Sequence, residues 1–387
     1  MEAALTLFGA GPVSLTLALL LARHAPDPAR IVICQSAQAA SGLDDDPRAI
    51  ALNHGSEMLL RQLHAWPERG TPIQHVHVSQ QGRLGRALIS HQDFSVPQLG
   101  TVVAYTDLVQ ALRQAIEHSG ITVLSGSPPE VLANHGTHSL LKQDGHTFTS
   151  RFCVHAEGGT YDKQAVQDWR RDYQQHAVLT LVQASRPKPG WAYERFTREG
   201  PLALLPYHDG PQGQRGRYSL VWCCTPERAA ALTALPPSAF ADALQHVFGD
   251  RLGQLSTPNP RQTFPLGLNA RRQLVWQNHV YIGNAAQTLH PVAGQGLNLG
   301  LRDAAQLAQS LRGRLDTAAP ETLLSDYARK RRTDRLLTLG VTDFLPRAFA
   351  TRLPVVEHAA GLALLGMDLS RRLRGPLAQH LLSGLRE

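Results

Sequence analysis

The chain has 387 residues, which is enough for about two domains with a substantial core. Its 43% hydrophobic and 18% charged residues are ordinary for a globular enzyme and exclude disordered and fibrous classes. The formal net charge is +7, but the arginines are scattered and no basic run is interleaved with aromatic residues. We therefore expect no nucleic-acid partner.

The compartment and the cysteines give a second set of exclusions. No apolar run reaches the ~18 residues that a membrane-spanning helix needs, and no signal peptide precedes the first apolar strand, so we expect a cytoplasmic protein. The four cysteines show no metal-binding spacing, and we interpret them as reduced and structural, with no metal site. They are Cys34, Cys153, Cys223 and Cys224.

The first predicted elements form a dinucleotide-binding fingerprint. Residues 4–8 are an apolar strand that leads into Gly9, Gly11 and Ser14, followed by a leucine-rich helix. Gly9 would make the tight turn, and Gly11 would let a pyrophosphate approach the backbone. Ser14 takes the third position, where the fingerprint has a glycine that brings helix and strand close. Because serine is small, we regard this as a mild departure.

The second predicted strand covers residues 31–34 and is followed by Gln35. The fingerprint usually has an acid at this position, which binds the ribose hydroxyls. An amide can still form that hydrogen bond but lacks the charge. We therefore expect Gln35 to bind ribose, with adenosine affinity weakened by about 1 kcal/mol.

Arg48 follows a polar loop and precedes a helix predicted over residues 57–63. A guanidinium placed there is able to contact phosphate or a bound cofactor. The alternative is an ion pair with one of the neighbouring aspartates, Asp44 to Asp46. The sequence leaves both interpretations open.

The remaining elements of the first half alternate between strands and helices. Alternation predicts strands over residues 73–80 and 86–98, and Asp144 followed by glycine predicts a hairpin within residues 140–153. The last strand of this part runs into a turn at Glu157. We expect residues 1–160 to belong to one nucleotide-binding domain.

The sequence pattern changes after residue 160. Residues 161–269 are rich in strand signals and predict a β-rich domain that would lie over the cofactor. The chain would then return to the first domain over residues 270–345 and end in a leucine- and arginine-rich helical segment, residues 346–387. The expected fold is α/β, with a discontinuous Rossmann-like domain, a β-rich domain and C-terminal helices.

The return to the first domain carries a second glycine-rich joint. A short strand at residues 280–282 leads through Gly283, Gly294 and Gly296 into a helix that we expect to start near Leu297. Such glycines let backbone N–H groups touch a ligand, and a helix N-terminus favours an anionic or electron-rich group. By itself the joint could be a ligand-free connection. Its pairing with the N-terminal fingerprint favours a cofactor site.

These motifs together resemble the flavin-dependent aromatic hydroxylases related to p-hydroxybenzoate hydroxylase. Within that family the chain is most similar to the UbiH type of ubiquinone-biosynthesis hydroxylase, the 2-octaprenyl-6-methoxyphenol hydroxylases. The resemblance covers nearly the whole chain. It rests on the two joints and on the segments 48–52, 193–206, 218–223, 283–300 and 340–343.

The resemblance implies FAD as the cofactor. Gly9, Gly11 and Ser14 would hold its pyrophosphate and Gln35 its ribose, while Gly283 and Asn284 would meet the pyrophosphate and ribityl chain. The other residues that it implicates in cofactor binding are Arg48, Glu157, Pro291, Gly294, Gln295, Gly296, Leu297 and Asn298.

The resemblance also implies the reaction. NAD(P)H would reduce FAD, and O2 would supply an oxygen atom to the ring of an electron-rich phenol, so no side-chain triad is expected. His290 is the titratable residue nearest the expected flavin loop. We consider proton transfer by His290 a weak candidate role and a structural hydrogen bond to the loop the alternative.

The implied partners are a polyprenylated phenol, O2, a quinone-biosynthesis complex and lipid-carrying accessory proteins. The basic, leucine-rich C-terminal helices could contact either the inner face of the membrane or such a partner, and a solvated helix face is the alternative. A competing interpretation is a non-catalytic paralogue that acts as a lipid-binding or scaffold subunit. Its support is the set of departures from the family pattern, at Ser14, Gln35, Thr106 and Glu157. A third interpretation, a nicotinamide-dependent dehydrogenase, would explain the N-terminal fingerprint but not the second glycine joint.

Overall fold

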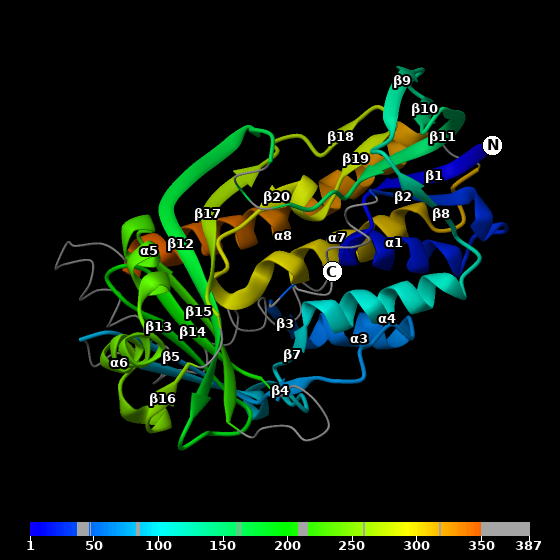
Figure 1. Ribbon diagram of the computed structural model, residues 1–387. Coiled ribbons are helices and arrows are strands. Elements are labelled where there is room, and N and C mark those ends of the chain that lie inside the picture. The colour runs from blue at the N-terminus through cyan, green and yellow to red at the C-terminus, as the bar shows by residue number, and fades with distance from the viewer. Residues whose placement is uncertain are drawn as a thin grey trace.

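The computed structural model describes residues 1–36, 46, 48–82, 86–159, 161, 164–207, 216–257, 260–316 and 319–349. Within these ranges the strands form an eight-stranded, a nine-stranded and a three-stranded sheet. The two large sheets lie at opposite ends of the molecule, and the long helices α7 (Gln295–Leu311) and α8 (Pro320–Phe349) extend between them (Figure 1). The expected α/β fold is confirmed.

The eight-stranded sheet has a parallel centre in the spatial order β8-β2-β1-β11-β19. In chain order this is 3-2-1-4-5, the arrangement of Rossmann-type nucleotide-binding sheets. The strands are β1 (Glu2–Phe8), β2 (Ile31–Ser36), β8 (Thr122–Gly126), β11 (His146–His155) and β19 (His279–Tyr281). Six of the seven residues of β1 are buried, because both faces of this sheet are covered.

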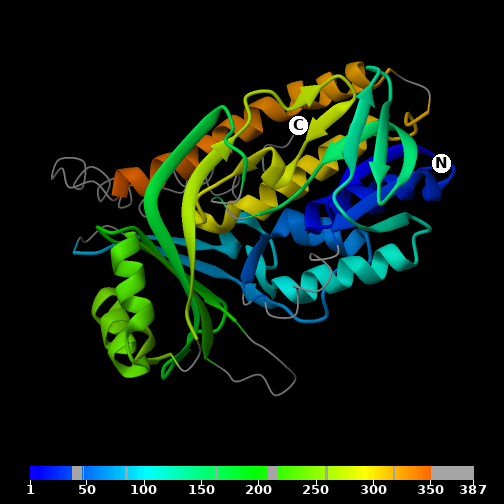
Figure 2. The same ribbon diagram turned by 45° about the horizontal axis from the view of Figure 1, so that its top comes forward.

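Helices cover one face of this sheet and a hairpin covers the other. Leucines of α1 (Pro12–Ala22) and α4 (Tyr105–Glu117) share a core with β1, β2, α7 and α8. On the opposite face, Leu141 and Phe148 pack against Phe8, Val32 and Cys153. Leu141 lies in β10 (Ser139–Gln143), which pairs with β9 (Glu130–Asn134) and β11 (Figure 2). The predicted turn is present, since Asp144 and Gly145 both have positive φ.

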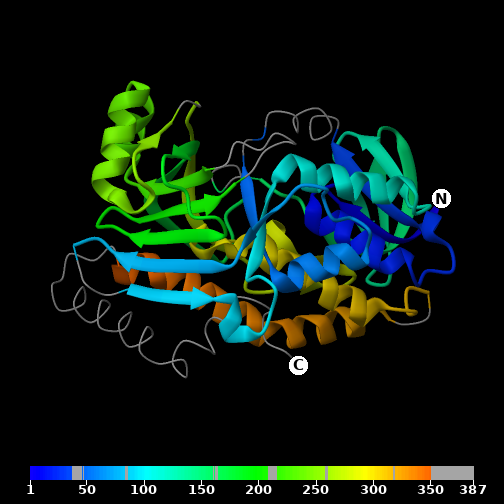
Figure 3. The ribbon, with the colours of Figure 1, turned by 90° about the horizontal axis from the view of Figure 1, so that it is seen from below.

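The nine-stranded sheet is mostly antiparallel and carries two helices on one face. Its strands are β5 (His75–Gln80), β6 (Arg86–Ser90), β12 (Trp169–Ala184), β13 (Trp191–Phe196), β14 (Pro201–Pro206), β15 (Arg217–Cys224), β16 (Leu255–Ser256), β17 (Gln262–Ala270) and β20 (Gln287–Thr288). Helices α5 (Pro226–Ala234) and α6 (Pro237–Phe248) bury Trp222, Phe240 and Phe248 against it (Figure 3). Helices α5 and α6 thus leave the opposite face of this sheet uncovered by themselves.

A three-stranded sheet and a short edge strand complete the fold. The three-stranded sheet contains β3 (Ala49–Asn53), β4 (Thr71–Ile73) and β7 (Gly100–Ala104), and α3 (His54–Gln62) follows β3. A short strand, β18 (Val275–Trp276), pairs with β19.

Three sequence expectations need correction. The strand expected over residues 86–98 ends at Ser90, where a capping box with Asp93 starts a 3-10 turn. Strands β5 and β6 join the nine-stranded sheet through a parallel pairing of β5 with β13, although we assigned residues 1–160 to the first domain. The boundary expected between residues 345 and 346 lies inside α8, which is continuous there despite Pro346. Periodicity predicts a strand but does not choose its partner strand.

The four cysteines are buried and free, as expected. Cys223 and Cys224 pack in different apolar clusters, on opposite faces of β15. Burial raises the pKa of Cys34 to about 12 and that of Cys153 to about 11, so both thiols stay protonated at neutral pH. Among the described helices, none combines the length and the apolar character required to cross a membrane.

Candidate cofactor site

Three loops meet where the parallel strands of the first sheet end. Phe8 of β1 is paired with His155 of β11, and His155 with Tyr281 of β19. The register continues past the strands, since the N–H of Ala156 donates to Phe8 O at 3.1 Å and that of Ile282 to His155 O at 3.0 Å. The loops after β1, β11 and β19 are therefore neighbours at the carboxyl edge, where nucleotides bind in sheets of this type.

Gly9 makes the first of these turns. Its φ is +97°, and its N–H donates to Cys34 O at 2.9 Å. A Cβ built on Gly9 would lie 3.1 Å from Glu157 Cα and 3.2 Å from Ala156 O. A side chain at residue 9 would thus push the first loop away from the loop after β11.

Ser14 has a different role from the one we expected. Its side chain is fully buried, and its Oγ donates to Gly9 O at 2.6 Å. The hydroxyl is therefore bonded within the protein and stabilises the turn at Gly9. Only the backbone of Ser14, in the first turn of α1, is placed to serve a pyrophosphate.

The second glycine joint lies directly against the first. Gly283 has φ +57°, and a Cβ built on it would lie 3.2 Å from Val13 Cγ2 in α1. A Cβ on Gly300 of α7 would lie 2.6 Å from the same Val13 atom and 3.2 Å from Gly283 Cα. The two joints, about 270 residues apart in sequence, come together because glycine at 283 and 300 lets α7 pack closely on α1.

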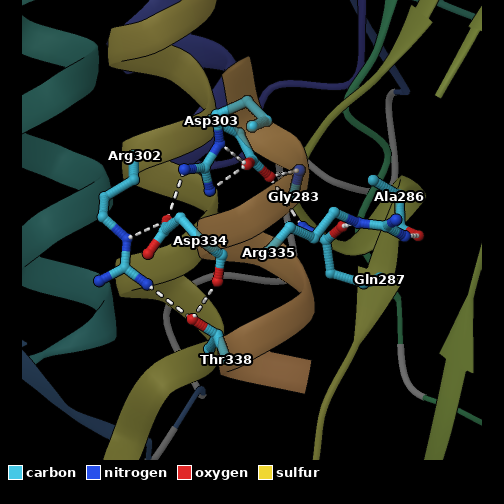
Figure 4. A network of polar contacts seen from close by, with 9 residues as sticks. Gly283, Ala286, Gln287, Arg302, Asp303, Asp334, Arg335 and Thr338 are labelled. Atoms are coloured by element: carbon cyan, nitrogen blue, oxygen red, sulfur yellow. Dashed lines mark hydrogen bonds and ion pairs between the residues drawn. The ribbon is translucent and has the colours of Figure 1, made fainter. Parts of the chain in front are cut away.

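A buried ionic network holds the Gly283 turn from behind (Figure 4). Asp303 Oδ2 accepts hydrogen bonds from Gly283 N at 3.1 Å and from Gln287 Nε2 at 2.7 Å. Asp303 Oδ1 accepts one from Arg331 Nε at 2.9 Å, and Arg331 also pairs with Asp334 at 2.5 Å. The network thereby connects the Gly283 turn to α7 and α8.

Sequence reasoning did not assign Asp303 a function. The residue lies three positions beyond the segment 283–300, and its helical spacing from Leu299 and Leu307 places it on the buried face of α7. A carboxyl on an apolar helix face is rare unless it is paired. That pattern was the available signal, but the partner Arg331 lies on another helix and no local spacing reveals it.

Helix α7 begins at Gln295, two residues before the expected start at Leu297. Gly294 precedes it with φ +61°, and no side chain caps the helix. Asn298 uses its side chain for hydrogen bonds within the protein. Its Nδ2 donates to Ala51 O at 2.9 Å and to Gly294 O at 2.8 Å, and its Oδ1 accepts from Asn53 N at 2.9 Å, so it fixes α7 to β3.

Glycines on three different segments border open space. A Cβ built on Gly11, Gly158 or Gly296 would meet no atom of the described residues within 4 Å. Two of these glycines lie at the starts of α1 and α7, whose amide groups favour anionic or electron-rich ligands. The arrangement fits an extended dinucleotide whose pyrophosphate approaches the backbone of the first loop.

The predicted ribose and phosphate ligands make contacts of their own within the protein. Gln35 Nε2 donates to Ser125 Oγ at 2.6 Å. Arg48 Nε donates to both carboxylate oxygens of Asp46, at 2.8 and 3.0 Å, and its guanidinium lies 4.2 Å from the ring centre of Tyr105. The ion pair that we considered for Arg48 is therefore present.

Glu157 and the other predicted ligands differ in their exposure to solvent. The Glu157 carboxylate is 3.4 Å from His155 Nδ1 and is exposed. Asn284 is exposed beside the Gly283 turn, whereas Pro291, Gly296 and Leu297 are partly buried and Gln295 is buried.

His290 forms a structural hydrogen bond to the flavin-facing loop expected from sequence. It is fully buried, and its Nδ1 accepts from Val292 N–H at 3.2 Å. Because Nδ1 accepts, the proton is on Nε2, which lies 3.1 Å from Gln175 Oε1 and donates to it. Burial lowers the pKa of His290 to about 3, so the ring is neutral at physiological pH.

A Rossmann-type sheet with two adjoining glycine joints, next to a second sheet, defines the class of dinucleotide-dependent oxidoreductases. The comparison with known sequences is more specific. The chain belongs to the FAD-binding-domain family, whose model matches residues 2–335. Its cofactor is FAD, and it is an FAD-dependent aromatic-ring monooxygenase.

Two relatives and one solved structure illustrate the kinship. Ubiquinone hydroxylase UbiL of Rhodospirillum rubrum is 31% identical over 364 residues, which cover 90% of this chain and 81% of the relative. The 3-demethoxyubiquinol 3-hydroxylase of Escherichia coli is 27% identical, with 94% of each chain covered. The p-nitrophenol 4-monooxygenase PnpA of Pseudomonas putida shares the fold, with a TM-score of 0.75, 15% identity and both chains fully covered.

Proposed function

We propose that this protein hydroxylates the aromatic ring of a polyprenylated phenol in ubiquinone biosynthesis, using FAD, NAD(P)H and O2. The observation that carries the proposal is the meeting of both glycine joints at one edge of the first sheet, in a chain related along most of its length to ubiquinone hydroxylases. Bound FAD supplies the redox chemistry, from NAD(P)H oxidation to insertion of one oxygen atom of O2.

The residues of the joints would bind and orient the cofactor. We propose that the backbone at Gly9, Gly11 and Ser14 holds the pyrophosphate and that Gly283 with Asn284 holds the ribityl region. The start of α7 would face the electron-rich edge of the flavin ring. Further proposed contacts come from Gln35, Arg48, Glu157, Pro291, Gly294, Gln295, Gly296 and Leu297, and from the backbone of Asn298.

One face of helix α8 suggests how the protein reaches a membrane-embedded polyprenyl tail. Lys330, Leu337 and Phe344 lie seven residues apart on one line of α8, and Leu337 and Phe344 are 47% and 64% exposed. Apolar side chains beside basic ones suit an anionic membrane surface. We propose that this face of α8 rests on the membrane. The predicted contribution of residues 350–387 lies outside the described residues.

Liposome co-sedimentation of the full chain tests the membrane contact. The variant Leu337→Glu with Phe344→Glu should lose most binding to vesicles that contain anionic lipid. Leu132→Glu, on β9, is the control, because Leu132 is also exposed at 44%. Equal binding of both variants and the parent chain would contradict the contact.

Spectroscopy and isotope labelling test the main proposal. The purified protein, reconstituted with FAD and desalted, should retain close to one flavin per chain and oxidise NAD(P)H faster when a prenylated phenol is added. Under ¹⁸O2 the product should carry one labelled oxygen. A protein that stays colourless after reconstitution would instead support a non-catalytic, lipid-binding or scaffold role.

A further inference from the structure

Glu194 lies in the middle of β13, with its carboxyl on the face of the nine-stranded sheet turned away from α6. Its two neighbours face α6, since the Tyr193 ring centre is 5.4 Å from that of Phe248 and Arg195 Nε donates to Val247 O at 2.8 Å. Successive side chains of a strand alternate between faces. Glu194 therefore points to the opposite side.

The surroundings of Glu194 on that face are small and apolar. Its partners in register are Ala203 on β14 and Val78 on β5. Val221 is paired with Ala203, and Ala87 with Val78. Alanine and valine occupy little volume above a sheet, so these positions accommodate a planar ring better than larger side chains would.

The carboxyl of Glu194 has no ionic or hydrogen-bonding partner among the described residues. Burial raises its pKa to about 7. The Cys223 thiol on β15 shares this face with Val221, and its own pKa is raised by burial and by Glu194. A partly buried carboxyl without a partner is costly, so a side chain that served only packing would be better apolar.

The same face meets the loop that precedes α7. Val292 of this loop forms one apolar cluster with Phe196 of β13 and Ala87 of β6. Phe196 is two residues from Glu194 and shares its face of the strand. Glu194 thus stands on the sheet beside the loop that leads into the helix N-terminus of the cofactor site.

We propose that the Glu194 carboxylate accepts the hydrogen bond of the substrate's phenolic hydroxyl and so orients the aromatic ring over the loop at Val292. The proposal rests on the phenol hydroxylase function proposed above. The substrate hydroxyl would supply the partner that the protein does not provide. A phenol would then be preferred over its methyl ether, which has no proton to donate.

The test uses the FAD-loaded full chain and two probes, a short-chain prenylated phenol and its methyl ether. Calorimetric dissociation constants are measured for both, together with the amount of hydroxylated product formed per NAD(P)H oxidised. The parent chain should prefer the phenol by about tenfold or more. Glu194→Ala should bind both probes nearly equally and lose most product formation per NAD(P)H. Glu194→Gln, which still offers an acceptor, should lie between them.

The control is Glu199→Gln. Glu199 follows the same strand but is exposed, with its carboxylate 3.8 Å from Arg228 Nε. This variant should match the parent chain in both measurements, and unchanged flavin content and melting temperature in Glu194→Gln would show that the fold is intact. If Glu194→Ala still prefers the phenol over its methyl ether, the role assigned to Glu194 is overturned, whereas the proposed function stands. A parent chain that neither binds nor hydroxylates the phenol would overturn the proposed function and this assignment with it.

Discussion

The Asp303 carboxylate accepts a hydrogen bond from the backbone N–H of Gly283 at 3.1 Å and pairs with Arg331 at 2.8 Å. One buried acid in α7 therefore connects the turn of the second joint to α8 (Figure 4). Asp303 is 1% exposed, and the Arg331 side chain is 6% exposed. Because both charges are buried, neither is tolerated well without the other.

Asp303→Asn should lower the free energy of unfolding by about 3–5 kcal/mol, because it leaves Arg331 with less compensating charge. Asparagine retains an acceptor for Gly283 N–H, so FAD should still bind to the protein that remains folded. Denaturant titration and flavin content per chain measure the two effects separately.

Asp316→Asn is the matched control for this prediction. Asp316 pairs with Arg30 at 2.7 Å, but both side chains are a third or more exposed. Its loss should cost less than about 1 kcal/mol. Equal losses of stability in the two variants would show that the Asp303 network contributes no more than a surface ion pair.

Gly300→Ala should separate α7 from α1. The added Cβ would lie 2.6 Å from Val13 Cγ2 and 3.2 Å from Gly283 Cα, so the helices must shift, at about 1–3 kcal/mol of stability. Gly340→Ala in α8 is the control, since a Cβ there meets no atom of the described part of the chain within 4 Å. It should stabilise the chain by roughly 0.5–1 kcal/mol through helix propensity. A stabilised Gly300→Ala variant would contradict the close packing.

The local features of this fold were predictable from the sequence, whereas the pairing of distant strands was not. The strand–glycine–helix joints at Gly9 and Gly283 were predictable because strand, turn and helix signals follow one another within a few residues. The pairing of β5 with β13 was not, because its partners are more than 100 residues apart. The expected β-rich domain, residues 161–269, omitted three strands of its own sheet, β5, β6 and β20.

The site residues show the same limit. Ser14 and Asn298 were assigned to the cofactor because they occupy motif positions, yet their side chains bond to Gly9 O and to β3 and its neighbours. Motif spacing fixes where a residue lies along the chain but not which way its side chain points. Asp303 and Glu194 were missed as functional candidates because the feature that distinguishes them, a buried partner or the lack of one, depends on the tertiary structure.

His290 makes a pH-dependent contribution to stability whose sign is fixed by its lowered pKa. Its pKa is about 3 in the folded chain and ~6.5 when unfolded, so the unfolded state binds the extra proton between these values. The contribution is complete above pH ~6.5 and is lost as the pH falls toward 3, by up to about 1.4 kcal/mol per pH unit.

The variant His290→Gln isolates this contribution. The difference in unfolding free energy between parent and variant should shrink steadily from pH 7 to pH 4.5. Because His279 is present in both proteins, its similar pH-dependent contribution cancels in this difference. The pH dependence of phenol hydroxylation should be the same in both, because the neutral imidazole transfers no proton. A shifted activity profile would instead assign His290 to proton transfer.

Gln35→Glu should tighten FAD binding. Gln35 is the second-to-last residue of β2, near the carboxyl edge of the sheet. A carboxylate there binds ribose hydroxyls more strongly than an amide does, by about 1 kcal/mol or roughly fivefold in the dissociation constant. Ser125 Oγ, now the acceptor for Gln35 Nε2 at 2.6 Å, can donate to the new carboxylate, so no buried polar group loses its partner. Fluorescence titration of the apoprotein with FAD gives the dissociation constant. Gln309→Glu adds the same charge at an exposed position of α7 and should change the dissociation constant by less than twofold. If both variants improve affinity equally, the gain comes from net charge and Gln35 does not contact the ribose.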